Sequence, residues 1–326
     1  MNVWRVHELG EPLEALRLDT VAPPEPQPGE LLIDVSACAL NFPDVLLCRG
    51  DYQEKPHLPF TPGLEIAGTV VGAPPGSSHE VGERVLATPR LPHGGLGERT
   101  IALDREAFAI PDSLDDASAA ALHVTYQTGW FGLYHRTQLR QGETLLVHAG
   151  AGGVGSAAIQ LGLAAGARVI ATAGGADKVQ ICRDLGADLA IDYRADDFVA
   201  AVKEATDGRG ADVIYDSVGG DTFDRSRRCV AFEGRILVIG FAGGRFADAP
   251  TNHILIKNYS VVGLHWGLYK RNDPELVVRC HDELLGLHAR GLIAPLISSQ
   301  RPLEEAPQAL TELAARGTWG KVVIRT

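Results

Sequence analysis

The chain has 326 residues, 45% of them hydrophobic and 22% charged, and a formal net charge of −11 at pH 7. This length is enough for two domains with full cores, and the composition is that of an ordinary soluble globular protein. The negative charge argues against nucleic acid or an anionic membrane surface as the main partner. No apolar segment reaches the ~18 residues of a membrane span, and residues 1–5 do not open a signal peptide.

The five cysteines are odd in number, widely spaced and never in a C-x-x-C pair; they are Cys38, Cys48, Cys182, Cys229 and Cys280. Neither a disulfide framework nor a zinc knuckle is therefore expected. Buried free thiols in a reducing compartment explain the pattern more simply, and we predict a cytoplasmic protein.

The part of the chain before about residue 122 combines short strands with turns rich in proline and glycine. Strands are predicted at residues 31–40, 66–71 and 84–87. The turns between and before them include Pro-Pro-Glu-Pro at 23–26 and Pro-Pro-Gly at 74–76. This pattern predicts an irregular, mostly antiparallel β domain.

From about residue 145 to 264, short β-branched runs alternate with helix-like segments. Strands are predicted at residues 144–147, 168–172, 189–192, 213–216, 236–239 and 260–264. The helices predicted between them span residues 154–165, 176–185, 197–205 and 221–229. The alternation predicts an α/β fold with a doubly wound parallel sheet of the Rossmann type.

The tail from about residue 268 is of mixed character, with a predicted helix at 303–315 and a final strand at 321–325. A strand in this position can pair back into the first domain. We therefore assign residues 1–122 and 268–326 to the β-rich domain and residues 123–267 to the dinucleotide-binding domain.

The predicted strand at 144–147 leads into a glycine loop that opens a helix of small residues. Its glycines follow the order G-x-G-x-x-G, which permits a tight turn, close approach of a pyrophosphate and close helix–strand packing. The start of the helix adds free N–H groups. We expect dinucleotide phosphates to bind here, against Gly150, Ala151, Gly152, Gly153, Val154 and Gly155.

Three further segments carry motifs that bear on family membership. The first comprises NFPD at 41–44, RGDY at 49–52 and PFTPGLEIAG at 59–68; the second is TYQTGW at 125–130 with Gln160 beyond the glycine loop; the third is DSVGG at 216–220. With the glycine loop they resemble the zinc-independent quinone oxidoreductase branch of the medium-chain dehydrogenase/reductase superfamily, over the whole chain. The resemblance implies a GroES-like catalytic domain beside the Rossmann domain, and a homodimer paired through the strand at 260–264.

The resemblance also bears on metal binding and on the substrate. Zinc-dependent relatives have a cysteine where this chain has Asn41, and a histidine where it has Leu64. Catalytic zinc needs about three protein ligands, and these two side chains supply neither thiolate nor imidazole. The four-cysteine zinc lobe is also missing, so we expect no metal. Two departures from the family pattern leave the substrate open: Gly150-Ala151 where family members often have two small non-glycine residues, and Leu163 in place of a basic residue.

The end of the second predicted strand lacks the acidic residue that binds a ribose 2′-hydroxyl in NAD-specific sites. Ala-Gly-Gly at 173–175 leaves room for a 2′-phosphate beside Gly174, and Lys178 can reach that phosphate as a point charge. By resemblance, Tyr193 and Arg316 complete the pocket. We therefore expect NADPH. The alternative is that Lys178 is a solvated helix residue and Arg316 a charge at a helix end.

Hydride transfer needs orientation and a dry cleft more than an acid or base, and no catalytic triad is visible. We expect Asn41 to face the nicotinamide and Tyr52 to bond a substrate carbonyl; alternatively, Tyr52 only packs in its loop. The remaining residues expected to line the cofactor are Thr128, Val218, Phe241 and Trp266. Trp266 alternatively belongs to a dimer interface or a core, and His148 is expected to be structural.

The leading functional prediction is an NADPH-dependent quinone oxidoreductase that works without a metal. The first alternative is reduction of an activated C=C bond in an enone or enoyl thioester, where Tyr52 donates a proton. The second is a non-catalytic NADPH-binding protein. In each case the expected partners are a small molecule and a second copy of the chain, not nucleic acid or a membrane.

Overall fold

The computed structural model describes residues 1–326 and divides into two compact units. The first comprises Met1–Val124 and Pro295–Thr326, and the second comprises Thr125–Ala294. The chain thus returns to the first unit later than the predicted residue 268. The reason is that α10 (Pro274–Ala289) is bound within the second unit: Glu283 on this helix accepts a 2.7 Å hydrogen bond from the Trp130 indole. No helix is both long and apolar enough to cross a membrane.

The second unit is built on a six-stranded parallel sheet, and the predicted α/β class is confirmed. Its order is β12-β11-β10-β7-β8-β9, so the strand order reverses at β7, which carries the glycine loop. The strands are β7 (Thr144–Val147), β8 (Arg168–Ala173), β9 (Leu189–Asp192), β10 (Ala211–Asp216), β11 (Val230–Val238) and β12 (Ser260–Gly263).

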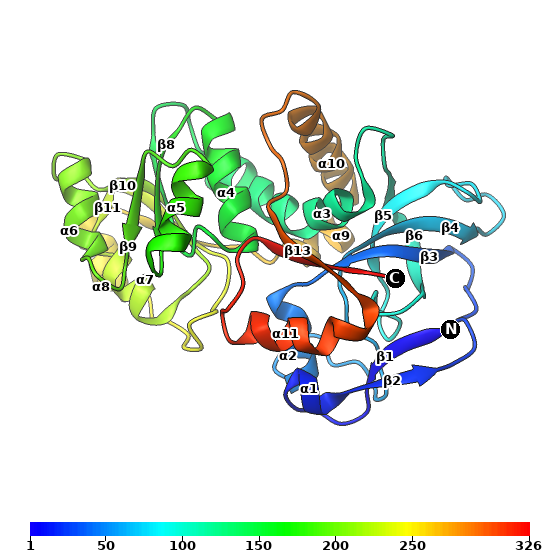
Figure 1. Cartoon of the computed structure of the whole chain (residues 1–326). Helices are drawn as coiled ribbons and strands as arrows, with labels where there is room; N and C mark the ends of the chain where they lie inside the picture. Colours follow the sequence, from blue (N-terminus) through cyan, green and yellow to red (C-terminus); the bar gives the residue numbers. More distant parts are fainter. The chain divides into compact units, whose positions relative to one another are not determined.

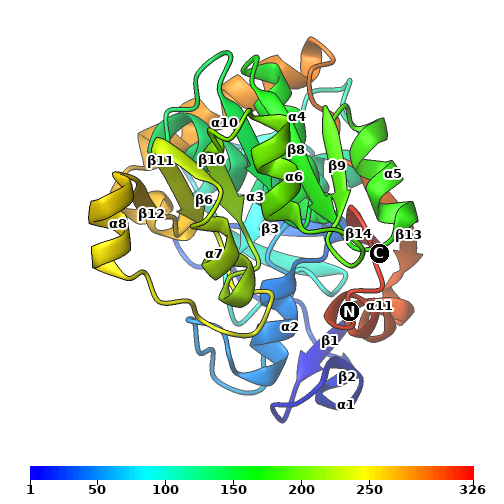
Figure 2. The same ribbon diagram turned by 90° about the vertical axis from the view of Figure 1, so that its left-hand side faces the viewer.

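Helices follow the strands, as the alternating pattern predicted. They are α3 (Asp116–Trp130), which continues as a π-helical segment (Phe131–Arg136), α4 (Gly153–Ala164), α5 (Ala176–Asp184), α6 (Phe198–Ala205), α7 (Gly220–Ser226), α8 (Thr251–Lys257) and α9 (Tyr269–Asn272), with a 3-10 turn at Trp266–Leu268. One core joins the inner faces of α6 and α7 to alternate residues of the sheet, such as Ile170 and Ile214. Figure 2 shows α8 beside β12 at one edge of this sheet and α5 beside β9 at the other.

The first unit is mostly antiparallel. Its strands are β1 (Asn2–Val6), β2 (Leu16–Thr20), β3 (Glu30–Ala39), β4 (Ile66–Gly72), β5 (Arg84–Pro89), β6 (Arg99–Ala109), β13 (Ile297–Pro302) and β14 (Lys321–Arg325). Because β3 pairs with both β4 and β6, the strands β3 to β6 close on themselves. The helices are α1 (Pro12–Ala15), α2 (Phe42–Arg49) and α11 (Ala306–Ala314), with a 3-10 turn at Leu303–Glu305.

The last strand pairs back into the first unit, as predicted. β14 lies antiparallel to β3, with Val323 opposite Ala39 and Ile324 opposite Cys38 (Figure 1, where β14 is red and β3 blue). β6 was not predicted, because Asp-Arg-Glu at 104–106 breaks its apolar alternation. This pairing joins the C-terminal strand to the sheet of β3 to β6 and sets the position of Lys321 at the start of β14.

Candidate functional site

The glycine loop after β7 has the close packing that a dinucleotide-binding turn requires. A Cβ on Gly155 would lie 2.2 Å from the Ala149 carbonyl oxygen, and one on Gly150 would lie 2.9 Å from the Cys182 sulfur. A Cβ on Gly152 would lie 3.3 Å from the Ala149 carbonyl oxygen, a looser approach than at Gly150 or Gly155. The left-handed residue of the turn is Ala149, with φ 52°.

The helix that follows offers hydrogen-bond donors at the same place. Gly152 is the N-cap of α4, and Gly153, Val154 and Gly155 form its first turn. The N–H groups of a first turn have no acceptor inside their own helix. With the positive end of the helix dipole they suit a bound pyrophosphate.

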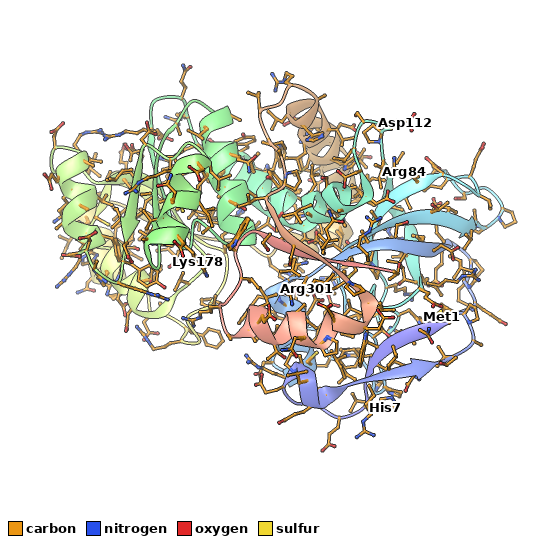
Figure 3. The ribbon with its side chains drawn as sticks, viewed as in Figure 1. Met1, His7, Arg84, Asp112, Lys178 and Arg301 are labelled. Carbon is orange, nitrogen blue, oxygen red and sulfur yellow. The ribbon has the colours of Figure 1, made fainter.

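The structure brings Gly174, Lys178 and Tyr193 together at the end of β8. A Cβ on Gly174 would lie 2.7 Å from the Tyr193 hydroxyl, and only glycine leaves that side chain in place. Lys178 lies on the first turn of α5 (Figure 3), where burial and then the charge of Arg194 lower its pKa. Arg194 was not predicted as a site residue. The sequence feature that could have pointed to it is its position directly after Tyr193, just beyond the third predicted strand.

Val218 and Phe241 lie on neighbouring loops of the second unit. Asp216 shapes the first loop by accepting hydrogen bonds from the N–H groups of Val218 and Gly219, each at 2.9 Å. A Cβ on Gly219 would lie 2.8 Å from the Phe241 ring, and the Phe241 ring packs edge-on against Phe246. The two predicted residues therefore belong to one surface after β10 and β11.

Trp266 is half-buried and held from two sides. Its indole donates a 2.9 Å hydrogen bond to Gln127, the neighbour of Thr128 on α3. The Lys270 ammonium lies 5.3 Å from the ring centroid. These contacts set the orientation of Trp266 within the second unit and place it close to the α3 turn that carries Thr128.

His148, the residue after β7, is structural. Its ring nitrogens lie 3.0 Å from the Thr172 hydroxyl and 2.8 Å from the Ser226 hydroxyl. Because Ser226 donates its own proton to the Thr222 carbonyl, Nε2 must carry the hydrogen and Nδ1 accepts from Thr172. Burial lowers the pKa of His148 to about 4, so the ring is neutral at pH 7.

In the first unit, Asn41 belongs to a buried polar network. Its amide group donates to the Ala39 carbonyl at 3.1 Å and to Glu65 at 2.9 Å, which uses both hydrogens. Its oxygen accepts a 2.7 Å hydrogen bond from the Lys321 ammonium. Lys321 also pairs directly with the Glu65 carboxylate, and both side chains are almost fully buried. The other Glu65 oxygen accepts from the Val124 N–H.

Asp44 joins this network to α2. It is fully buried and accepts hydrogen bonds from the N–H groups of Asn41 at 2.8 Å and of Gly63 at 2.9 Å. These bonds fix Asn41 as the N-cap of α2 and tie it to the segment that carries Glu65. Burial raises the pKa of Asp44 to about 6 against the effect of its hydrogen bonds.

Tyr52 is half-buried, and its ring packs on the core of the first unit. Burial raises the pKa of its hydroxyl to about 12, and the charges of Glu54 and Asp44 add to this rise. The hydroxyl is therefore protonated at pH 7 and remains a hydrogen-bond donor. Arg316, the last predicted site residue, also lies in the first unit; it follows α11 in the left-handed conformation with φ 59°.

Comparison with known proteins shows the family. Residues 27–111 match the family described as the alcohol dehydrogenase GroES-like domain, and residues 153–282 match that described as zinc-binding dehydrogenase. The quinone oxidoreductase-like protein 2 homolog of Nematostella vectensis is 39% identical over 98% of this chain and 87% of its own length.

Solved structures agree with the sequence comparison. The Escherichia coli quinone oxidoreductase complexed with NADPH is 30% identical, with a TM-score of 0.93 over 100% of both chains. A mycobacterial protein complexed with NADPH is 31% identical, with a TM-score of 0.93 over 100% of both chains. The chain belongs to the quinone oxidoreductase family of the medium-chain dehydrogenase/reductase superfamily, whose members are oxidoreductases.

The residues around Asn41 do not fit a zinc ion, although one matching family is described as zinc-binding. The Lys321 ammonium lies between Asn41 and Glu65, so a metal cation there would meet a fixed positive charge. Leu64 has no donor atom. No group of three or more His, Cys, Asp or Glu side chains is placed to hold a metal ion.

Replacing Lys321 by methionine should lower the free energy of unfolding by about 3–5 kcal/mol, because the buried Glu65 carboxylate is left without its counter-charge. Urea denaturation measures this. The double variant Lys321→Met with Glu65→Gln removes both charges and should lose clearly less than the sum of the single variants. Additive losses would show that the pair is not coupled.

The depressed pKa of His148 makes stability depend on pH. Between its ordinary value near 6.5 and about 4, the unfolded chain binds a proton that the folded chain does not. The free energy of unfolding should therefore fall with decreasing pH, by about 1.4 kcal/mol per pH unit from this group. His148→Gln should lose this component in denaturation curves measured from pH 7 to 4. An unchanged slope in the variant would assign the pH dependence elsewhere. Asp44, with its raised pKa, contributes the opposite slope in both proteins.

Proposed function

We propose that this protein is an NADPH-dependent reductase that transfers a hydride to a quinone without a metal ion. The observation that carries the proposal is the end of β8, where Gly174, Lys178 and Tyr193 gather beside the glycine loop. The Asp192 carboxylate nearby is used by the backbone, since one of its oxygens accepts from the N–H of Gly175 at 3.0 Å. Two related structures complexed with NADPH support the choice of coenzyme.

The residues proposed to hold NADPH fall into three groups. The first-turn N–H groups of α4 take the pyrophosphate, and Lys178, Tyr193 and Arg316 take the 2′-phosphate. Thr128, Val218, Phe241 and Trp266 lie toward the nicotinamide. When bound, NADPH supplies the hydride, and the protein contributes binding, orientation and exclusion of water.

We assign different roles to Tyr52 and Asn41, both of which lie in the first unit. Tyr52 has a protonated hydroxyl with no hydrogen bond to another protein group, so it can donate to a substrate carbonyl. Asn41 has both amide hydrogens engaged and offers the substrate only a lone pair of its oxygen. A quinone takes its protons from water, so this set of groups is sufficient for its reduction.

The same hydroxyl supports a second candidate, the reduction of an activated C=C bond. Protonation of an enolate carbon benefits from a positioned acid, and a neutral tyrosine can supply the proton. The half-buried, protonated Tyr52 is the observation that favours this candidate. The two reactions differ in whether the protein must give up a proton.

We propose a homodimer formed through the β12 edge of the parallel sheet. β12 pairs only with β11, so one edge of it offers unpaired backbone groups. The preceding α8 has no buried residue, and Leu255 and Ile256 on it are 76% and 73% exposed. A second copy that covers both features would bury this apolar surface.

We also propose that the protein works in the reducing cytoplasm. All five cysteines are free and buried. Burial raises the pKa of the thiols of Cys48, Cys182 and Cys229 to about 12, so reactive thiolates are scarce at neutral pH. Free structural cysteines of this kind are typical of a reducing compartment.

Tyr52→Phe tests the reaction. The wild type should oxidise NADPH with a quinone, and the variant should keep that rate within a few fold, because a quinone does not need a protein acid. If the wild type also reduces enones, the variant should lose roughly 10²–10⁴-fold of that activity. Tyr269→Phe, another half-buried tyrosine, is the matched control. NADPH oxidation without a quinone preference, or none at all, would contradict the proposal.

The double variant Leu255→Asp with Ile256→Asp tests the dimer. Charges on the exposed face of α8 should shift the sedimentation equilibrium from dimer to monomer, because they would be buried without partners. Leu13→Asp places a charge at another exposed leucine, in the first unit, and should leave the dimer intact. A monomeric wild type, or a double variant that stays dimeric, would refute an interface on α8.

A further inference from the structure

The end of β8 also carries a cationic side chain that the proposed NADPH site does not use, that of Arg194. Arg194 lies two residues beyond β9, on the turn that begins with Asp192. Its Nε would lie 3.0 Å from a Cβ on Gly174, and one of its terminal nitrogens 3.6 Å from a Cβ on Gly175. The guanidinium therefore lies over the two glycines that follow β8, beside the Tyr193 hydroxyl.

The backbone of this turn is held in place independently of the guanidinium. One Asp192 oxygen accepts hydrogen bonds from the N–H groups of Arg194 and Gly175, each at 3.0 Å. The same bonds tie the turn to the start of α5, which carries Lys178. The backbone of Arg194 is thus held at the sheet edge, and its side chain is exposed there.

The guanidinium makes no ion pair or hydrogen bond with another protein group. The Asp192 carboxylate attracts it, but the hydrogen bonds of Asp192 go to the backbone. The exposed Asp177 forms no ion pair. Arg194 instead lies near a second cation, and its charge contributes to the lowered pKa of Lys178. Two adjacent cations on a strongly acidic chain are stabilised by an anion that both can reach.

We propose that Arg194 is a further specificity-determining residue, whose guanidinium binds the 2′-phosphate of a 2′-phosphorylated adenine nucleotide. The inference rests on the proposed NADPH site, since the second strand of a doubly wound sheet ends at the adenosine ribose. The planar fork of an arginine matches two phosphate oxygens, whereas Lys178 gives a single point charge. Gly174 and Gly175 leave the space that this geometry needs.

Isothermal titration with 2′,5′-ADP and with 5′-AMP separates the phosphate contact from the rest of the nucleotide. Arg194→Ala should weaken binding of 2′,5′-ADP roughly tenfold to hundredfold and leave 5′-AMP unchanged. Arg194→Lys keeps the charge but not the fork, and should give an intermediate loss. Arg183→Ala removes an exposed arginine from the last turn of α5 and is the control for a general change in charge.

The outcomes distinguish this inference from the choice of coenzyme. If the wild type prefers 2′,5′-ADP and Arg194→Ala behaves like Arg183→Ala, Arg194 does not bind the 2′-phosphate. In that case only this inference fails. If the wild type binds both nucleotides equally, the proposed NADPH site fails and Arg194 with it. Neither result depends on turnover, so the identity of the hydride acceptor does not affect the test.

Discussion

The buried ion pair between Lys321 and Glu65 is the interaction on which the first unit depends. Two charges removed from water are stable only when their hydrogen bonds are complete, and here each finds further partners. The pair also binds Asn41 and so holds the start of α2. Since Lys321 comes from β14 and Glu65 from the segment before β4, the pair closes the C-terminal strand onto the N-terminal fold.

The Lys321–Glu65 ion pair also limits the chemistry that the side chain of Asn41 can support. With an ammonium beside it and both amide hydrogens engaged, Asn41 is an anchored group rather than a free donor. The fixed positive charge also disfavours a metal cation. Under the proposed function, the first unit contributes the neutral hydroxyl of Tyr52, which suits hydride transfer to an acceptor that needs little acid–base help.

The second unit rests on steric rather than electrostatic constraints. Gly155 is needed because any side chain there would collide with the Ala149 carbonyl, and Gly174 because it makes room for Tyr193. Such constraints arise between residues close in sequence or in successive strand–helix units. This explains why the glycine spacing and the alternating strands were sufficient to predict the parallel sheet and the position of the glycine loop, whereas the strand order came from the structure.

Local pattern by itself determined the α/β class, the six parallel strands, the glycine loop and the glycine-rich end of β8 that precedes Lys178. Other features depend on residues far apart in the chain. Lys321 meets Asn41 across 280 residues, and nothing at the start of a short strand marks a lysine as buried. The membership of α10 in the second unit, the place of Arg194 over the glycines and the engaged amide of Asn41 likewise follow from tertiary contacts. Periodicity shows which face of an element is apolar, but the three-dimensional fold decides which polar groups meet when those faces are buried.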